Sequence, residues 1–107
     1  MDRSIKAKIL EELGGISETI YDDLVKEFTE EAQRSLAVFT SSISKGDHEA
    51  VARLAHTLKG SSGNLRLYDI QEAAKYLEGA ARERRDNKEM GIRFDIFCDA
   101  LAKLKMP

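Results

Sequence analysis

Residues 17–46 read SETIYDDLVKEFTEEAQRSLAVFTSSISKG and contain the longest uninterrupted apolar periodicity in the chain. Ser17 is a residue type that commonly caps a helix start, and Lys45-Gly46-Asp47 is a sequence that ends one. Because apolar residues recur every three or four positions, the stretch predicts one long amphipathic helix over residues 17–44. The apolar positions are Ile20, Leu24, Phe28, Ala32, Leu36, Phe39 and Ile43.

Shorter segments on both sides of this helix show the same helical spacing. Gly14-Gly15 is suited to a left-handed stop after the first segment, and Asp47 can cap the segment that follows the long helix. Asp69, with Glu72 three residues later, resembles a capping box. We therefore expect four more helices, over residues 4–13, 48–64, 69–85 and 89–105.

The simplest fold for these elements is all-α. The only proline is Pro107, so nothing inside the chain interrupts a helix, and no β-rich run is present. Four amphipathic helices joined by short loops bury their apolar faces as an antiparallel four-helix bundle. We predict that bundle with an additional short N-terminal helix across one end, in a single domain over residues 1–107.

The composition argues against several function classes. With 17 basic and 19 acidic side chains, a net charge of −2 gives no positive field for nucleic acid or a membrane surface. The chain lacks a membrane-spanning apolar run and the apolar centre of a secretory signal, so we expect a cytoplasmic monomer. Cys98 is the only cysteine and there are two histidines, which leaves no zinc quartet. Cys98 is expected to be a small buried hydrophobe, and His48 a solvated surface residue.

The third predicted helix carries the candidate chemistry. Its apolar stripe places His56 on the far side, with Lys59 one turn along and Gly60 and Gly63 nearby. A helical glycine costs about 0.5 to 1 kcal/mol relative to alanine, and close approach of another protein backbone would explain Gly60. A largely neutral exposed imidazole has a lone pair for attack on phosphorus, and Lys59 can neutralise phosphoryl oxygens. From spacing alone, an ordinary surface histidine remains an alternative.

Residues 55–65, AHTLKGSSGNL, closely resemble the His-x-x-Lys-Gly-x-Ser signature of histidine phosphotransfer (HPt) domains, and the likeness extends from about Ile20 to Leu104. The resemblance implies that His56 is the phosphorylated residue and Lys59 its charge partner. It also implies a polar support for the imidazole on the next helix, for which Glu78 is the candidate; an ordinary solvated charge is the alternative for Glu78. The implied docking residues for a receiver domain are Gly60, Ser61, Gly63 and Ala52.

One position departs from the resemblance. The family usually has Gly-Ala or Gly-Leu after the position of Leu65, whereas this chain has Arg66-Leu67. The turn between the third and fourth helices is therefore expected to differ. Asn64 is the candidate for the left-handed conformation there, because asparagine tolerates it better than most residues.

The function implied by the resemblance is that of a phosphoryl carrier in a signalling phosphorelay. His56 would accept the group from a receiver aspartate and pass it to another, with Mg²⁺ supplied by the receiver and no cofactor or metal of the chain's own. A pure binding module is one alternative. An enzyme such as an autokinase is another, although the chain lacks a nucleotide fingerprint. The N-terminal domain type of chemotaxis kinases shares the signature; the start at Met1 and the end after Leu104 favour a free-standing protein or an excised domain.

Overall fold

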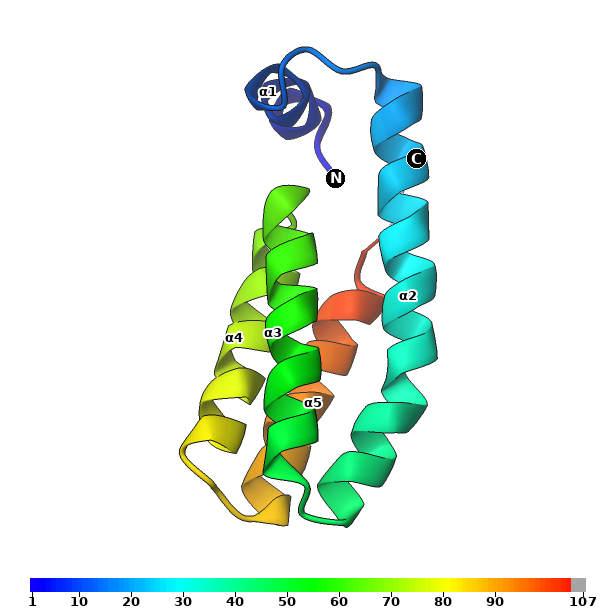
Figure 1. Ribbon diagram of the computed structural model, residues 1–107. Helices are drawn as coiled ribbons and strands as arrows, with labels where there is room; N and C mark the ends of the chain where they lie inside the picture. The colour runs from blue at the N-terminus through cyan, green and yellow to red at the C-terminus, as the bar shows by residue number, and fades with distance from the viewer. Residues whose placement is uncertain (105–107) are drawn as a thin grey trace.

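The computed structural model describes residues 1–104, which form five helices and no strand. Helices α2 to α5 alternate in direction and form the bundle, while α1 lies across the end at which α2 begins (Figure 1). The predicted all-α bundle with a short N-terminal helix is confirmed. The helices are α1 (Arg3–Glu12), α2 (Glu18–Ser44), α3 (His48–Asn64), α4 (Tyr68–Arg82) and α5 (Asn87–Ala102).

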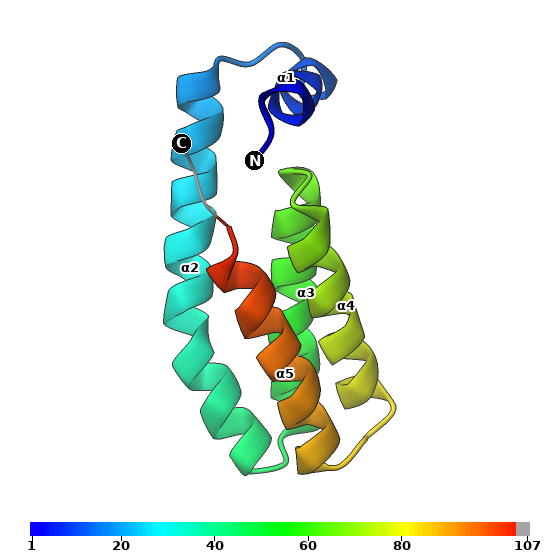
Figure 2. The same ribbon diagram turned by 180° about the vertical axis from the view of Figure 1, so that it is seen from behind.

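The bundle is arranged around α4, which packs along both α3 and α5. Helix α2 contacts α3 and α5 and closes the bundle on the remaining side (Figure 2). An aromatic contact joins α2 to α5, because the ring centroid of Phe39 lies 5.2 Å from that of Phe94 and 5.8 Å from that of Phe97. Helices α3 and α4 lie side by side, which is the arrangement on which the functional site depends.

The first turns of α2 bury a different face from the one predicted. Tyr21 and Val25 are fully buried, whereas Ile20 and Leu24 are exposed, so the predicted apolar face is wrong there. The hydroxyl of Tyr21 donates to the backbone carbonyl of Leu65 at 2.6 Å. Because this bond satisfies a carbonyl at the end of α3, it selects a polar aromatic residue over the neighbouring aliphatic ones.

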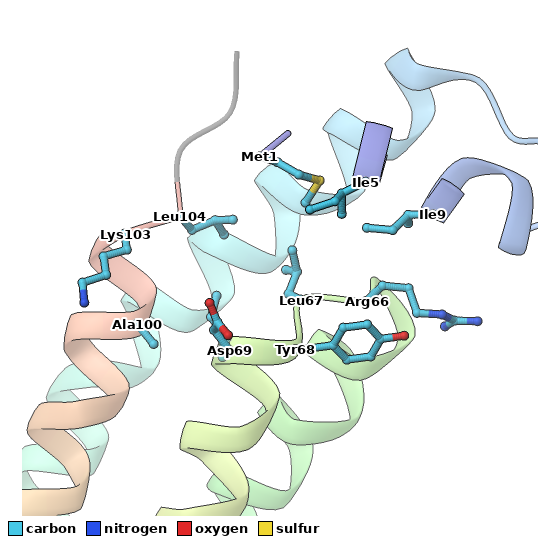
Figure 3. A pocket seen from close by; sticks show the side chains of 11 residues that line it. Met1, Ile5, Ile9, Arg66, Leu67, Tyr68, Asp69, Ala100, Lys103 and Leu104 are labelled. Carbon is cyan, nitrogen blue, oxygen red and sulfur yellow. The ribbon is translucent and has the colours of Figure 1, made fainter. Parts of the chain in front are cut away.

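Helix α1 is attached to the bundle by a buried lysine and an apolar contact. The ammonium of Lys6 lies 2.7 Å from the Asp22 carboxylate and 3.0 Å from the Glu18 carboxylate. Both carboxylates raise the pKa of Lys6, and Asp22 has the larger effect. Figure 3 shows Ile5 and Ile9 on one side of a pocket of about 280 Å³, which the connection between α3 and α4 also lines. This pocket lies at the end of the bundle, where α1 covers the α3–α4 turn.

Several predicted helix ends are corrected by the caps. Helix α4 begins at Tyr68 without a side-chain cap, so the capping box predicted at Asp69 is wrong. It ends at Arg82, three residues before the predicted end, and Arg84 then takes a left-handed φ of 54°. The Asp86 carboxylate accepts from the Glu89 amide at 2.9 Å and starts α5 two residues early. Helix α5 ends at Ala102, and the predicted end at residue 105 lies outside the described residues.

The side chain of Cys98 on α5 is half-buried, so the prediction that it is a buried hydrophobic residue is wrong.

The turn from α3 to α4 places Arg66 itself in the left-handed conformation, with φ of 61°. Asn64 stays helical, so the expectation for that residue is wrong. A non-glycine residue pays about 1 kcal/mol or more in this region. The guanidinium of Arg66 offsets part of that cost, because it donates to the carbonyls of Gly63 at 3.3 Å and Asn64 at 3.1 Å. The turn therefore forms with arginine at the position where the resemblance led us to expect glycine.

Candidate functional site

His56 projects into solvent from the outer face of α3. Its side chain is 61% exposed, while Val51, Ala55 and Leu58 on the opposite face are fully buried. The carboxylate of Asp47 accepts from the Ala50 amide at 3.1 Å and caps this helix, as predicted. A partner molecule can therefore reach an imidazole that is mounted on a packed, capped helix.

Glu78 of α4 lies directly behind the imidazole. Its Oε2 is 3.0 Å from Nδ1 of His56, and the residue is 5% exposed. The interpretation of Glu78 as a solvated surface charge is therefore wrong, and the alternative, a carboxylate beside the active imidazole, agrees with the geometry. The contact exists because α3 and α4 pack along their whole length.

The Glu78 carboxylate also binds two cationic side chains. Nζ of Lys59 lies 2.7 Å from Oε1, while Nη2 and Nε of Arg82 lie 2.7 and 2.8 Å from Oε2. Sequence reasoning predicted Lys59 as a charge partner of a phosphoryl group and missed Arg82. The spacing of four residues between Glu78 and Arg82 is the signal that could have found it, since such residues are neighbours on a helix.

These contacts determine which nitrogen of His56 is free. Burial alone would raise the pKa of Glu78, but hydrogen bonds from Lys59, Arg82 and His56 lower that pKa to about 2. At neutral pH the carboxylate is ionised and can only accept hydrogen bonds, so Nδ1 of His56 must donate. In the neutral imidazole, Nε2 then carries the lone pair, on a side chain that is 61% exposed.

The lowered pKa of Glu78 predicts a specific acid sensitivity. The carboxyl has an ordinary pKa of 4.5 and a folded-state pKa of about 2, so below pH 4.5 the unfolded chain binds the proton first. The stability that Glu78 contributes, on the order of 3 kcal/mol, is therefore intact above about pH 4.5 and lost as the pH falls towards 2. Denaturant unfolding of the wild type and of Glu78→Gln from pH 6 down to 2 measures it. The difference between their unfolding free energies should shrink across that interval; a constant difference would contradict the assignment.

A hollow of about 390 Å³ opens beside His56, between α3 and the end of α4. Arginine side chains from both helices line it, which makes this part of the surface basic although the chain as a whole is acidic. Ala52, predicted as a docking residue, lies in this lining and is only 6% exposed. The lining residues are His48, Glu49, Ala52, Arg53, His56, Thr57, Ala81, Arg82 and Arg84.

The predicted docking residues next to His56 differ in what surrounds them. Gly60 is exposed, and a Cβ added there would meet nothing within 4 Å. A Cβ added to Gly63 would lie 2.5 Å from Nε2 of Gln71 on α4, so the end of that flexible side chain would have to move. Ser61 is half-buried, and its neighbour Ser62 is buried with its hydroxyl donating to the Leu58 carbonyl at 2.7 Å. Among these predicted docking residues, Gly60 is the glycine at which an added side chain would meet open space.

His48 is not the solvated surface residue that the sequence suggested. It is half-buried, and its Nε2 lies 2.6 Å from the backbone carbonyl of Arg85. Because a carbonyl only accepts, Nε2 of His48 donates, and the contact connects the start of α3 with the loop after α4. Within residues 1–104, no group of three or more histidine, cysteine or acidic side chains is arranged to hold a metal ion.

The fold and the site define an all-helical bundle that presents a solvent-facing histidine backed by a buried carboxylate. A family model described as the Hpt domain matches residues 23–104, and the chain belongs to this family. Its members are carriers of phosphoryl groups in two-component phosphorelays and interact with receiver domains, so the chain is a histidine phosphotransfer domain of a signalling system. The comparisons with curated proteins and with solved structures gave no match. None of the described helices is long and apolar enough to cross a membrane.

Proposed function

We propose that this chain carries a phosphoryl group on Nε2 of His56, which it accepts from the aspartyl phosphate of one receiver domain and passes to the aspartate of another. The observation that supports this most directly is the contact of Nδ1 with the buried Glu78 carboxylate at 3.0 Å. Because that contact fixes the proton on Nδ1, the nitrogen that faces a partner is the one with the lone pair.

The transfer step involves one bond formed and one bond broken. The Nε2 lone pair attacks phosphorus in line, the N–P bond forms, and the P–O bond to the receiver aspartate breaks, which releases an aspartate carboxylate. The proton stays on Nδ1, so the phosphorylated ring carries a positive charge next to the negative Glu78. That pairing stabilises the intermediate without removing a proton, and the reverse sequence delivers the group to the next receiver.

Charge neutralisation on the phosphoryl oxygens comes from both molecules. Lys59 is one turn from His56 on α3 and 29% exposed, so its ammonium is within the same surface. The receiver brings its acidic pocket and Mg²⁺, and this chain contributes no cofactor. Since phosphoryl transfer depends mainly on positioning and electrostatics, one nucleophile and one lysine on an open helix face are sufficient. Gly60 leaves that face free for the partner backbone.

A pure binding module is the main alternative, in which the same face docks a receiver without being phosphorylated. Docking alone would not require the imidazole to be oriented by a buried, ionised carboxylate, and this observation favours transfer. An autokinase would be labelled by ATP alone, which we do not expect. The cytoplasmic location and the monomeric state stay predictions from the sequence.

Incubation with a receiver domain carrying a labelled aspartyl phosphate tests the proposal. Label should move to the chain as an acid-labile, alkali-stable phosphoramidate that peptide mapping places on His56, and a second, unlabelled receiver should then remove it. Tight receiver binding without label would instead establish the binding-only alternative. Labelling by ATP in the absence of any receiver would show an enzyme.

A further inference from the structure

Arg82 binds the same carboxylate oxygen that accepts the hydrogen bond from Nδ1 of His56. Its Nη2 and Nε lie 2.7 and 2.8 Å from Oε2 of Glu78, and Nδ1 of His56 lies 3.0 Å from that atom. Lys59 contacts only the other oxygen, Oε1, at 2.7 Å. Arg82 and His56 therefore share Oε2 of Glu78, whereas Lys59 binds Oε1 alone.

This arrangement leaves Lys59 with two demands on its charge. Before phosphorylation its ammonium is paired with Glu78. While the phosphoryl group arrives, before the N–P bond has formed, the same ammonium is needed by phosphoryl oxygens that carry close to two negative charges at neutral pH. The flexible lysine stem can change partner, whereas the planar arginine fork is already engaged through two donors on one oxygen. Lys59 is thus the cation that moves, and it can do so without disturbing Oε2.

The carboxylate that Lys59 would leave behind is buried. Glu78 is 5% exposed, and a buried charge without a cationic partner is strongly unfavourable. The imidazole gains its positive charge only when the N–P bond forms. If Lys59 were the only cation on Glu78, its movement towards the incoming phosphoryl group before that point would leave the carboxylate without a cationic partner, and Lys59 would remain on Glu78. Arg82 avoids this cost, because its guanidinium stays on the Glu78 carboxylate when Lys59 leaves.

We propose that Arg82 is a positioning residue, which keeps the Glu78 carboxylate on Nδ1 of His56 while Lys59 moves from Glu78 to the phosphoryl group on Nε2. This rests on the proposed function of His56 and adds to it the residue that frees the lysine. Arg82 touches neither the phosphoryl group nor the reacting nitrogen, and no proton is transferred as Lys59 changes partner.

The tautomer of His56 in the unphosphorylated chain tests the proposal without any transfer reaction. Imidazole ¹⁵N–¹H correlation spectra report which nitrogen is protonated, and Lys59→Ala reproduces the departure of the lysine. We expect the wild type and Lys59→Ala to show only the Nδ1–H form. Adding Arg82→Ala to Lys59→Ala should introduce the Nε2–H form, whereas adding Arg82→Lys should not. An Nε2–H signal already in Lys59→Ala, or its absence from the folded Lys59→Ala, Arg82→Ala variant, would overturn the proposal.

A rate measurement with a matched control completes the test. Arg82→Ala alone should slow phosphoryl uptake from a receiver by roughly tenfold, because Lys59 is then retained by Glu78, and Arg82→Lys should restore most of the rate. Arg84→Ala removes a positive charge from the same hollow but no contact of Glu78, so it should leave the tautomer of His56 unchanged.

Slower uptake together with an unchanged His56 tautomer in every Arg82 variant would show that Arg82 acts directly on the phosphoryl group, and would reject the positioning role. If the wild type takes up no phosphate at all, the proposed function fails while the tautomer result still decides the role of Arg82.

Discussion

Replacement of His56 by glutamine should reduce labelling by a phosphorylated receiver domain by at least about a thousandfold, because it removes the nucleophile. A glutamine amide nitrogen has no available lone pair, since its electrons are delocalised into the carbonyl. The side chain is 61% exposed and glutamine suits a helix, so the bundle should keep its stability. Transfer of labelled phosphate, followed over time at equal protein concentrations, measures the effect.

The matched control is His48→Gln, which changes the other histidine of the chain on the same helix. His48 also borders the hollow beside His56, but its Nε2 faces the Arg85 carbonyl at 2.6 Å and is not directed at a partner. A glutamine amide can donate to that carbonyl, so labelling of this variant should match the wild type. Label retained by His56→Gln and lost from His48→Gln would assign the chemistry to His48 and reject the proposed site.

The features that the sequence predicted well are those governed by a single helix. The periodicity of α3 places Val51 and Leu58 inside and His56 outside, whatever the neighbouring helices do, and the structure agrees. The caps at Ser17 and Asp47 depend on local backbone geometry and were also predicted correctly. Local chemistry is readable from sequence because its partners lie within a few residues.

The features that the sequence could not predict depend on how one helix lies against another. Whether Glu78 met the imidazole or solvent depended on the register of α4 along α3, which periodicity does not determine. The burial of Tyr21 in place of Ile20 depended on a carbonyl in the α3–α4 turn. In that turn, tertiary contacts and hydrogen bonds of Arg66 overrode the preference for glycine at positive φ. Such features can be read only from the packed structure, because residue propensities alone predict the wrong residue as buried or as left-handed.

Replacement of Gly60 by glutamine should slow transfer by about a hundredfold while making the isolated bundle more stable. The residue lies on the exposed face of α3 one turn after His56, and an added Cβ has open space around it. Glutamine should therefore fit and raise the unfolding free energy by about 0.5 to 1 kcal/mol, because it replaces a helical glycine. A receiver backbone that docks there would be held about 1 Å or more from its productive position, and such a displacement costs about two orders of magnitude in rate.

Gly91→Gln is the matched control, because Gly91 is also a helical glycine with nothing within 4 Å of an added Cβ, but it lies on α5. Both variants should gain stability in thermal unfolding, whereas only Gly60→Gln should lose kcat/KM for transfer. The opposite signs of the two effects exclude misfolding as the cause of a slower reaction. Because Gly60 has no packing reason to be glycine, wild-type transfer rates in a stabilised Gly60→Gln would mean that receivers approach His56 from another side, over the basic hollow that Arg53, Arg82 and Arg84 line.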